Sequence, residues 1–404
     1  MTHSKQKHIL SLTAFILAAG SAQAYDLSLG TNLPPVDLHG FFSQGYLDSS
    51  KYNYLGDSSR GSFNYTEAGI NASINPFPRT RITVQGFLFE VGNAGKYEPL
   101  LDYASIEYTF NDYFGLRAGR IRKPGGLYNT IQDIDLARTS VLLPQGIYDA
   151  RFRDFSTSLD GGEAFGTLPL SKAGSLGYEV YSGLINIAAD SGVADIINNS
   201  LTPGKITSFD QFEETGAQLW WNTPLDGLRV GAAFGYAFNF DYNFTEPTGY
   251  PPPYNTASLN TKGAIVVQQY SVEYLWKNWT FQAEYYHLQT SQDTFDAGTL
   301  ANHSFTHENT WYGDASYRFN KWLEVGGYYS ELYQGGTALA TASQGYQKDA
   351  ALSFRFDPAS WWVFKVEGHC IHGTALLDDN TDNPVRNQNG KPWYMLAVKT
   401  TFSF

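Results

Sequence analysis

Cysteine and charged residues are scarce in this chain of 404 residues. The single cysteine, Cys370, has no partner in the chain, which excludes a scaffold held together by internal disulfides. Charged residues make up only 16% of the sequence, where an average soluble protein has roughly 25%. Acidic residues outnumber basic residues by 39 to 27, and the resulting formal charge of −12 disfavours nucleic acid as a partner.

Long apolar runs are also missing. Beyond residue 24 there is no apolar stretch of roughly 18 or more residues, so the sequence predicts no transmembrane helix there. Before that point, two lysines precede an apolar run over 9–19, and Ala22-Gln23-Ala24 offers the small residues that signal peptidase requires. We expect residues 1–24 to be a cleaved secretory signal peptide, rather than a buried helix at the start of a cytosolic protein. Cleavage removes two lysines and no acid, so the charge of −12 becomes −14.

Aromatic residues and alternation are what the sequence does have. Trp, Tyr and Phe together make up 16% of the chain, which argues against disorder. From residue 25 onward, segments of about ten residues carry apolar groups at every second position and are separated by Gly, Asn, Asp and Pro. This pattern is typical of an all-β transmembrane antiparallel β-barrel, whose strands face lipid on one side and water on the other. We therefore expect 25–404 to form one outer-membrane β-barrel.

Individual segments show both faces. In 228–238 every second residue is apolar, and in 361–371 a mostly apolar row alternates with Lys365, Glu367 and His369. A soluble β-sandwich alternates as well, but aromatic residues at the ends of the apolar rows and strong charges on the opposite face favour the barrel. The segments with this pattern are 39–48, 66–74, 80–90, 101–110, 113–121, 155–164, 174–185, 215–223, 228–238, 266–276, 279–289, 310–319, 322–333, 349–356, 361–371 and 394–404.

The last segment ends on an aromatic residue. Its alternate row runs from Tyr394 to Phe404, where the sequence stops. A terminal aromatic on such a strand resembles the targeting signal of bacterial outer-membrane proteins. We expect this strand to pair with the first one, because an open sheet edge would face lipid without hydrogen bonds. The segments predict about 16 strands, enough to enclose a water-filled lumen.

The connections between segments alternate in length. Short turns such as Asn111-Asp112 and Lys277-Asn278 are expected on the periplasmic side, and long connections on the outer side. The long connections are expected near 49–61, 122–154, 186–212, 240–262, 290–308, 334–345 and 372–392.

The segment 117–154 concentrates basic charge in an otherwise acidic chain. Its seven basic and four acidic residues give it a net charge of +3, which leaves −17 for the rest of the mature chain. It also holds apolar residues, such as Leu127, Ile131 and Leu143, that an exposed loop would not favour. We expect a constriction loop over about 122–154, folded into the lumen and packed on the inner wall. Its candidate pore residues are Arg117, Arg120, Arg122, Arg138, Arg151, Asp133 and Asp135.

A run of residues in this segment resembles proteobacterial outer-membrane porins, including 16-stranded porins related to the phosphate-selective group. The run consists of Gly119-Arg120, Pro124, Gly126-Leu127-Tyr128-Asn129, Asp133, Arg138, Leu143-Pro144-Gln145 and Tyr148. The signal peptide, the strand pattern and the terminal Phe404 extend the resemblance over the whole chain. It implies that the third long loop folds into the pore and forms the constriction, and that the protein forms a homotrimer. The chain differs from strongly anion-selective porins in having no dense rows of lysine.

These features predict a channel for passive diffusion of small hydrophilic solutes and ions, located in the outer membrane among lipids and lipopolysaccharide. Opposed Arg and Asp side chains across a narrow neck would create a transverse field that sorts solutes by size, charge and dipole. Alternatively, these charges pair with each other and only hold the loop to the wall. Two other functions stay open: a specific channel for an anionic solute such as phosphate or an organic acid, and a surface adhesin or rim enzyme on a closed barrel.

No catalytic, cofactor or metal site is readable, and we expect no enzyme activity. The histidines are scattered without a nucleophile motif. On a strand, His369 would face inward and Cys370 outward, so they could not bind the same ion. The run 378–389 begins like a calcium-binding loop, but Asn383 and Asn389 replace the required Gly and Glu.

Overall fold

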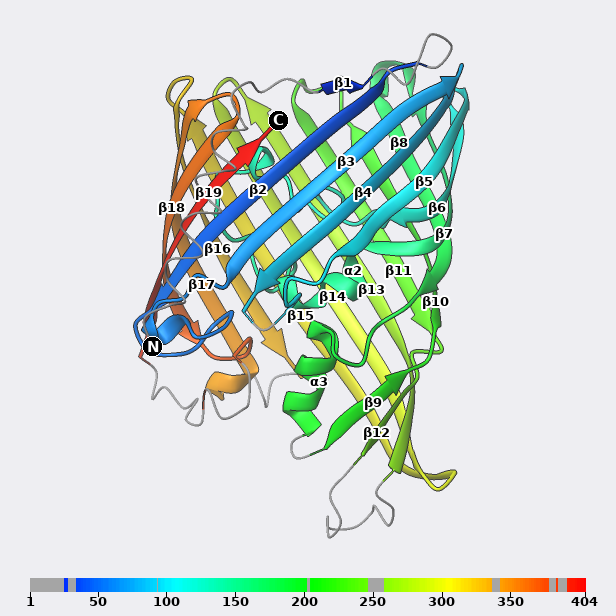
Figure 1. The fold of residues 1–404 in the computed structure, drawn as a ribbon, viewed down its shortest axis with the longest axis vertical. Coiled ribbons are helices and arrows are strands. Elements are labelled where there is room, and N and C mark those ends of the chain that lie inside the picture. The colour runs from blue at the N-terminus through cyan, green and yellow to red at the C-terminus, as the bar shows by residue number, and fades with distance from the viewer. Residues whose placement is uncertain are drawn as a thin grey trace.

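The alternating segments fold as strands of one sheet that closes on itself (Figure 1). The structure is a computed structural model that describes residues 25–27, 34–92, 94–201, 204–245, 258–335, 342–377, 383 and 391–404. The expected signal peptide, 1–24, lies outside these residues, as does all of the calcium-like run except residue 383.

Within the described residues, nineteen strands belong to this antiparallel sheet, and sixteen of them close the barrel. The last strand pairs with the first barrel strand, from Met395 opposite Ser49 to Ser403 opposite Phe41. This pairing leaves no open edge whose backbone N–H and C=O groups would face lipid. The predicted strand number, and the predicted closure by the last strand, are confirmed.

Each of the sixteen predicted segments overlaps one barrel strand. The first eight are β2 (Val36–Ser49), β3 (Tyr65–Phe77), β4 (Thr80–Val91), β5 (Leu100–Asn111), β6 (Phe114–Arg122), β7 (Ser158–Pro169), β8 (Ser175–Ile185) and β10 (Phe212–Asn222). The others are β11 (Leu228–Phe238), β13 (Ser258–Trp276), β14 (Trp279–Asp296), β15 (Thr299–Arg318), β16 (Leu323–Gln334), β17 (Tyr346–Ala359), β18 (Trp362–Gly373) and β19 (Trp393–Ser403). Three short strands extend the sheet: β1 (Tyr25–Leu27), β9 (Lys205–Phe209) and β12 (Tyr242–Thr245).

The two faces of the strands differ in character as the alternation predicts. On β17, Leu352 is 54% exposed, whereas its neighbour Ser353 is 1% exposed and Arg355 is 7% exposed. On β18, Glu367 is buried inside and Cys370 is exposed outside. Apolar side chains therefore cover the outside of the barrel and polar side chains the inside, the arrangement expected for a barrel in lipid.

The two ends of the barrel differ in the length of their connections (Figure 1). Residues 277–278 alone join β13 to β14, whereas the opposite end carries α3 (Gly192–Leu201), β9 and β12. The predicted long loop at 290–308 is wrong, because these residues continue β14 and β15 as a tall hairpin that turns at 297–298. Polar residues occupy both faces of that hairpin, so no apolar row marked it as a strand.

Helical structure is confined to short pieces. Besides α3, the chain has α2 (Arg153–Ser156) and the 3₁₀ turns η1 (Ser58–Arg60), η2 (Asp135–Ala137), η3 (Ala150–Phe152), η4 (Ser171–Ala173) and η5 (Ser343–Gly345). None of the helices among the described residues combines the length and apolarity needed to cross a membrane.

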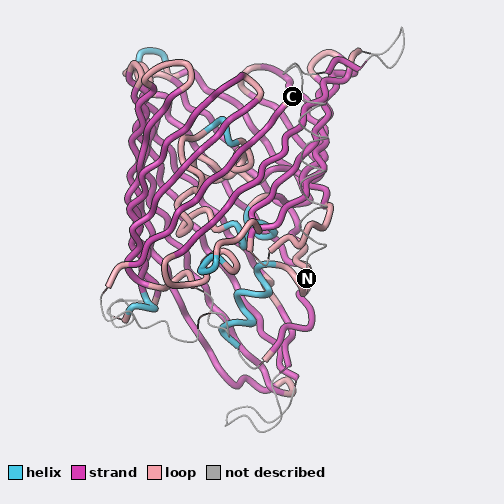
Figure 2. Tube along the Cα trace, turned by 60° about the vertical axis from the view of Figure 1, so that its left-hand side comes forward, coloured by secondary structure: helices cyan, strands magenta, loops and turns pink. Residues whose placement is uncertain are grey.

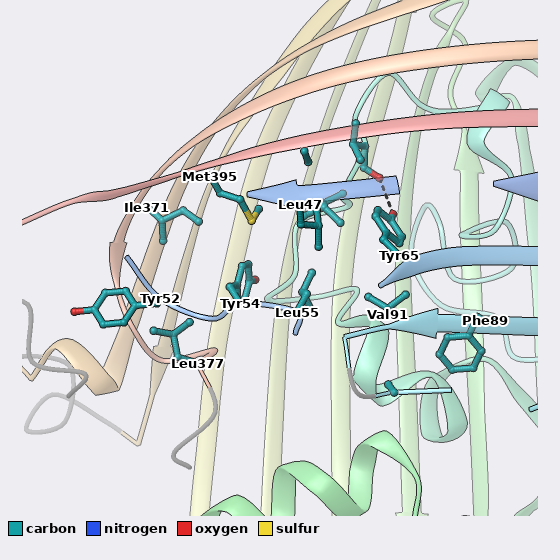
Figure 3. Packing of buried hydrophobic residues seen from close by; sticks show 14 of the residues in the cluster. Leu47, Tyr52, Tyr54, Leu55, Tyr65, Phe89, Val91, Ile371, Leu377 and Met395 are labelled. Carbon is teal, nitrogen blue, oxygen red and sulfur yellow. Dashed lines mark hydrogen bonds between the residues drawn. The ribbon is translucent and has the colours of Figure 1, made fainter. Parts of the chain in front are cut away.

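A buried apolar cluster holds the long connections to the inner wall (Figure 3). Leu47 of β2 and Met395 of β19 pack against Tyr54 of the connection that follows β2. The hydroxyl of Tyr65 donates a hydrogen bond of 3.2 Å to the carbonyl oxygen of Val141, which lies between β6 and β7. The long connections thus form part of the packed interior at this end of the barrel.

We predict that Leu352→Arg lowers the free energy of unfolding in lipid vesicles by about 2–4 kcal/mol, because it puts a cation on the lipid-facing row near the middle of β17. Urea unfolding followed by tryptophan fluorescence measures the change. Ser291→Arg, at an exposed position of the tall hairpin, is the matched control and should have little effect. An equal loss in both variants would contradict the assignment of this row to lipid.

Candidate pore and the segment between β6 and β7

The chain between β6 and β7, residues 123–157, bonds to inward-facing side chains on many strands of the wall; we call it the inner segment. Figure 2 shows its pink loops and short cyan helices within the outline of the strands. It extends slightly beyond the predicted range of 122–154. Hydrogen bonds or ion pairs connect it to β2, β3, β5, β6, β10, β13, β14, β16, β17, β18 and β19.

A glycine lets the inner segment approach the wall closely near its start. Gly126 has a φ of 60°, and a Cβ there would lie 2.0 Å from Nε2 of Gln269 and 2.5 Å from Oε1 of Glu284. Any other side chain would have to displace Gln269 and Glu284 and adopt a backbone conformation that glycine takes most readily. The next backbone N–H, that of Leu127, donates a 2.8 Å hydrogen bond to Glu284 on β14.

Glu284 is a buried carboxylate that accepts hydrogen bonds from neutral donors. The hydroxyl groups of Ser271 and Tyr148 each donate at 2.5 Å, and that of Tyr312 donates at 2.9 Å. These bonds satisfy a charge that would otherwise be costly to bury. Leu127 and Tyr148 both belong to the inner segment, so Glu284 holds two separate positions of that segment at the same place on the wall.

Asp135 binds the middle of the inner segment to another part of the wall, formed by β18 and β19. Its carboxylate is 1% exposed and lies 2.9 Å from Nζ of Lys399, 3.1 Å from Nη2 of Arg138 and 3.5 Å from Nζ of Lys365. Lys399 also pairs with Glu67 of β3. Burial alone would raise the pKa of Asp135, but the three cations outweigh burial and hold the pKa far below its usual range.

A second network joins the inner segment to β5 and β6. Asp133 and Asp102 face Arg122 and Arg153, with Arg122 at 2.5 Å from Asp102 and 2.6 Å from Asp133. Arg153 pairs with both aspartates, lies 2.7 Å from Asp102, and stacks over the ring of Phe87. Burial raises the pKa of Asp133, and Arg153 and Arg122 more than reverse the effect, so its pKa is also held far below normal.

Glu367 of β18 binds the inner segment through its backbone. The N–H groups of Val141 and Leu142 donate hydrogen bonds of 2.8 Å and 3.0 Å to this fully buried carboxylate. Glu367 also lies 2.9 Å from Nε2 of His369, whereas Cys370 is exposed on the other face. In the described part of the chain, no group of three or more His, Cys, Asp or Glu residues could hold a metal ion.

All seven candidate pore residues take part in ion pairs. Asp133, Asp135 and Arg138 are buried in the networks above. The side chains of Arg117 and Arg120 remain 27% exposed, and those of Arg122 and Arg151 remain 14% exposed. The structure therefore brings Arg122 to Asp133 and Arg138 to Asp135, and it pairs the other three with carboxylates outside the predicted set. Their role in a pore stays a prediction. The pairs outside the two networks are Arg117 with Glu107 and Glu163, Arg120 with Asp160, and Arg151 with Asp149.

Towards the short-turn end, partly exposed arginines line the inner wall. Arg117, Arg229 and Arg318 each alternate with outward-facing neighbours and have side chains that are 27%, 38% and 33% exposed. Each pairs with carboxylates, so charges of both signs face the lumen there. Arg229 and Arg318 are not among the predicted site residues, although a lone arginine between apolar residues on a strand was a signal for them.

We predict that Asp135→Asn lowers the free energy of unfolding by about 3–5 kcal/mol, because it leaves buried cations without their counter-charge. Urea unfolding in micelles or vesicles measures the loss. Asp160→Asn is the matched control: its side chain is 44% exposed, so it should cost less than about 1 kcal/mol. Similar losses for both variants would show that Asp135 does not stabilise the fold through its charge.

The lowered pKa values of Asp133 and Asp135 predict a loss of stability in acid. A carboxylate whose pKa is lower in the folded state stabilises the fold at neutral pH, and that contribution disappears as the pH falls below about 5. The urea midpoint of the wild type should therefore fall between pH 7 and pH 3. The midpoint of Asp135→Asn should fall less over the same range, and parallel curves would contradict the prediction.

The comparison with known proteins gives a fold but no family. No family model and no curated protein matches the sequence. The structure is similar to that of OmpT of Vibrio cholerae, with 12% identity and a TM-score of 0.57 over 93% of this chain and 99% of that one. It is also similar to the outer membrane channel DcaP of Acinetobacter baumannii, with 10% identity and a TM-score of 0.54 over 92% and 97%. OmpF of Salmonella typhi, solved with daunomycin, matches with 14% identity and a TM-score of 0.54 over 94% and 100%. The chain therefore has the fold of outer-membrane β-barrel proteins.

Proposed function

We propose that the protein is an outer-membrane porin, a water-filled channel for passive diffusion of small hydrophilic solutes and ions. The observation that carries this proposal is the closed barrel of sixteen strands with an apolar outside and a charged inside. Side chains of the wall can fill a barrel of about eight strands, whereas larger barrels leave an aqueous interior.

In this proposal the inner segment narrows the channel. The buried Asp133, Asp135 and Arg138 hold it in place, and the partly exposed Arg117 and Arg122 contribute to the field that solutes meet. Paired charges of both signs create a transverse field without a large net charge. Such a neck sorts solutes by size and dipole.

The remaining parts of the proposal follow from the place of such a channel in the cell. Residues 1–24 direct export and are removed, and 25–404 form the barrel. The outside of the barrel contacts membrane lipids and lipopolysaccharide. We also propose a homotrimer; one solved structure of the similar OmpT is described as a trimer form.

A specific channel for an anion such as phosphate has less support. That function would need basic side chains free to bind the solute, whereas each basic residue among the seven candidates has a carboxylate partner. A surface adhesin or a rim enzyme on a closed barrel would pass no current, so a measurement of conductance separates both from a porin.

Planar bilayer recording of the purified, folded protein tests the proposal. We predict stepwise conductance, and the absence of any step from folded protein would reject the porin. Arg117→Gln should then lower the anion-to-cation permeability ratio, because Arg117 is a partly exposed cation on the inner wall. Arg60→Gln removes the same charge from an exposed turn and should leave the ratio unchanged.

A further inference from the structure

A cavity of about 580 Å³ lies between the inner segment, α3 and the inward faces of β13, β14 and β15. Its volume is within the range of roughly 300–1,000 Å³ that is usual for small-molecule sites. The strands contribute a rigid wall on one side, and α3 contributes Val193 and Ile197 on the other. The cavity is therefore formed by elements far apart in the sequence. Of the seven predicted pore residues, Arg151 alone lines it.

The wall of the cavity has an apolar floor. Val267 of β13 stands opposite Leu288 of β14 in the ladder, and Ile265 lies one inward position further along β13. The rings of Phe240 and Tyr286 also line the cavity. An apolar or aromatic body of a few carbon atoms would be well accommodated by these side chains.

Next to this floor stands a carboxylate that forms no ion pair with any residue the structure describes. Glu308 of β15 is opposite Leu288 in the ladder and half-buried. Its carboxylate accepts a 3.1 Å hydrogen bond from Nε2 of Gln334, and no Lys, Arg or His of the described residues lies within 4.0 Å of it. Burying a charge without a partner is unfavourable, so a cation at this point would be stabilised.

The other charges of the cavity are already paired. Lys123 lies 3.0 Å from Glu214, and Arg151 lies 2.6 Å from Asp149. With Glu308, the cavity is lined by three carboxylates and two cations, a formal charge of −1 when all five are ionised. An anionic solute would therefore meet repulsion, and a neutral one would leave Glu308 unpaired.

We propose that this cavity binds small organic cations, with an ammonium group on Glu308 and an apolar or aromatic body on the floor formed by Ile265, Val267 and Leu288. Binding itself is independent of conduction. The idea that such cations bind here on their way through the barrel rests on the proposed porin function.

Isothermal titration calorimetry on the full-length folded protein in micelles tests the site. The probe is phenethylammonium at pH 7, compared with phenethyl alcohol, which is neutral, and 3-phenylpropionate, which is an anion. Affinity should decrease in that order. Because a hydrogen bond to a charged group is strong, Glu308→Gln should weaken binding of the cation about ten- to a hundredfold and leave binding of the alcohol unchanged.

Two further variants sharpen the result. Asp314→Asn removes an inward-facing carboxylate from the same strand outside the cavity, so it should not change the affinity for the cation. Leu288→Trp fills the cavity and should weaken binding of the cation and the alcohol alike. Equal affinity for the three probes, or an equal loss for Glu308→Gln and Asp314→Asn, would overturn the site. Conductance without this binding refutes the site alone, whereas binding without conductance refutes the porin alone.

Discussion

The pairing of β19 with β2 is the constraint on which the rest of the structure depends. Lipid offers no hydrogen bonds, so an open edge would leave a row of backbone groups unsatisfied. Closing sixteen strands removes both edges and fixes which residues face lipid, because side chains alternate along every strand. Closure also encloses more space than the side chains of the wall can fill. The inner segment occupies part of that space.

The position of the inner segment is set by charge on both sides. Arg122 and Arg138 form ion pairs with carboxylates. Backbone N–H groups of the segment donate hydrogen bonds to the wall carboxylates Glu284 and Glu367. A buried charge is tolerated when it is paired or hydrogen-bonded, and each of these groups meets that condition. The acidic excess of the whole chain thus partly serves a structural purpose. It supplies wall carboxylates that pair with cations of the inner segment or accept hydrogen bonds from its backbone, while the segment's own four basic and four acidic residues balance.

The sequence predicted the strands of the wall far better than the interactions inside the lumen. Strand positions follow from alternation, which is a local property, so β11 and β18 were found from a few residues each. The extension of β14 and β15 over 290–308 was missed because polar residues on both of its faces carry no such pattern. The partners of Asp135 could not be predicted: Lys365 is 230 residues away, and only the path of the chain brings them together. Glu308 was missed for the same reason, since only the path of the chain leaves it without a Lys, Arg or His close by among the described residues.

Because the inner segment is bonded to strands around most of the circumference, it connects distant strands across the lumen and resists deformation of the barrel. It also fills part of the lumen. A barrel without such connections can flatten or widen in response to lateral pressure from the bilayer, limited only by its ladder hydrogen bonds. Here Asp135 ties β18 and β19 to a segment that Glu284 ties to β14. Deformation of the cross-section would have to break buried ion pairs. The width of the lumen should accordingly be a property of the chain, insensitive to the thickness or composition of the membrane around it.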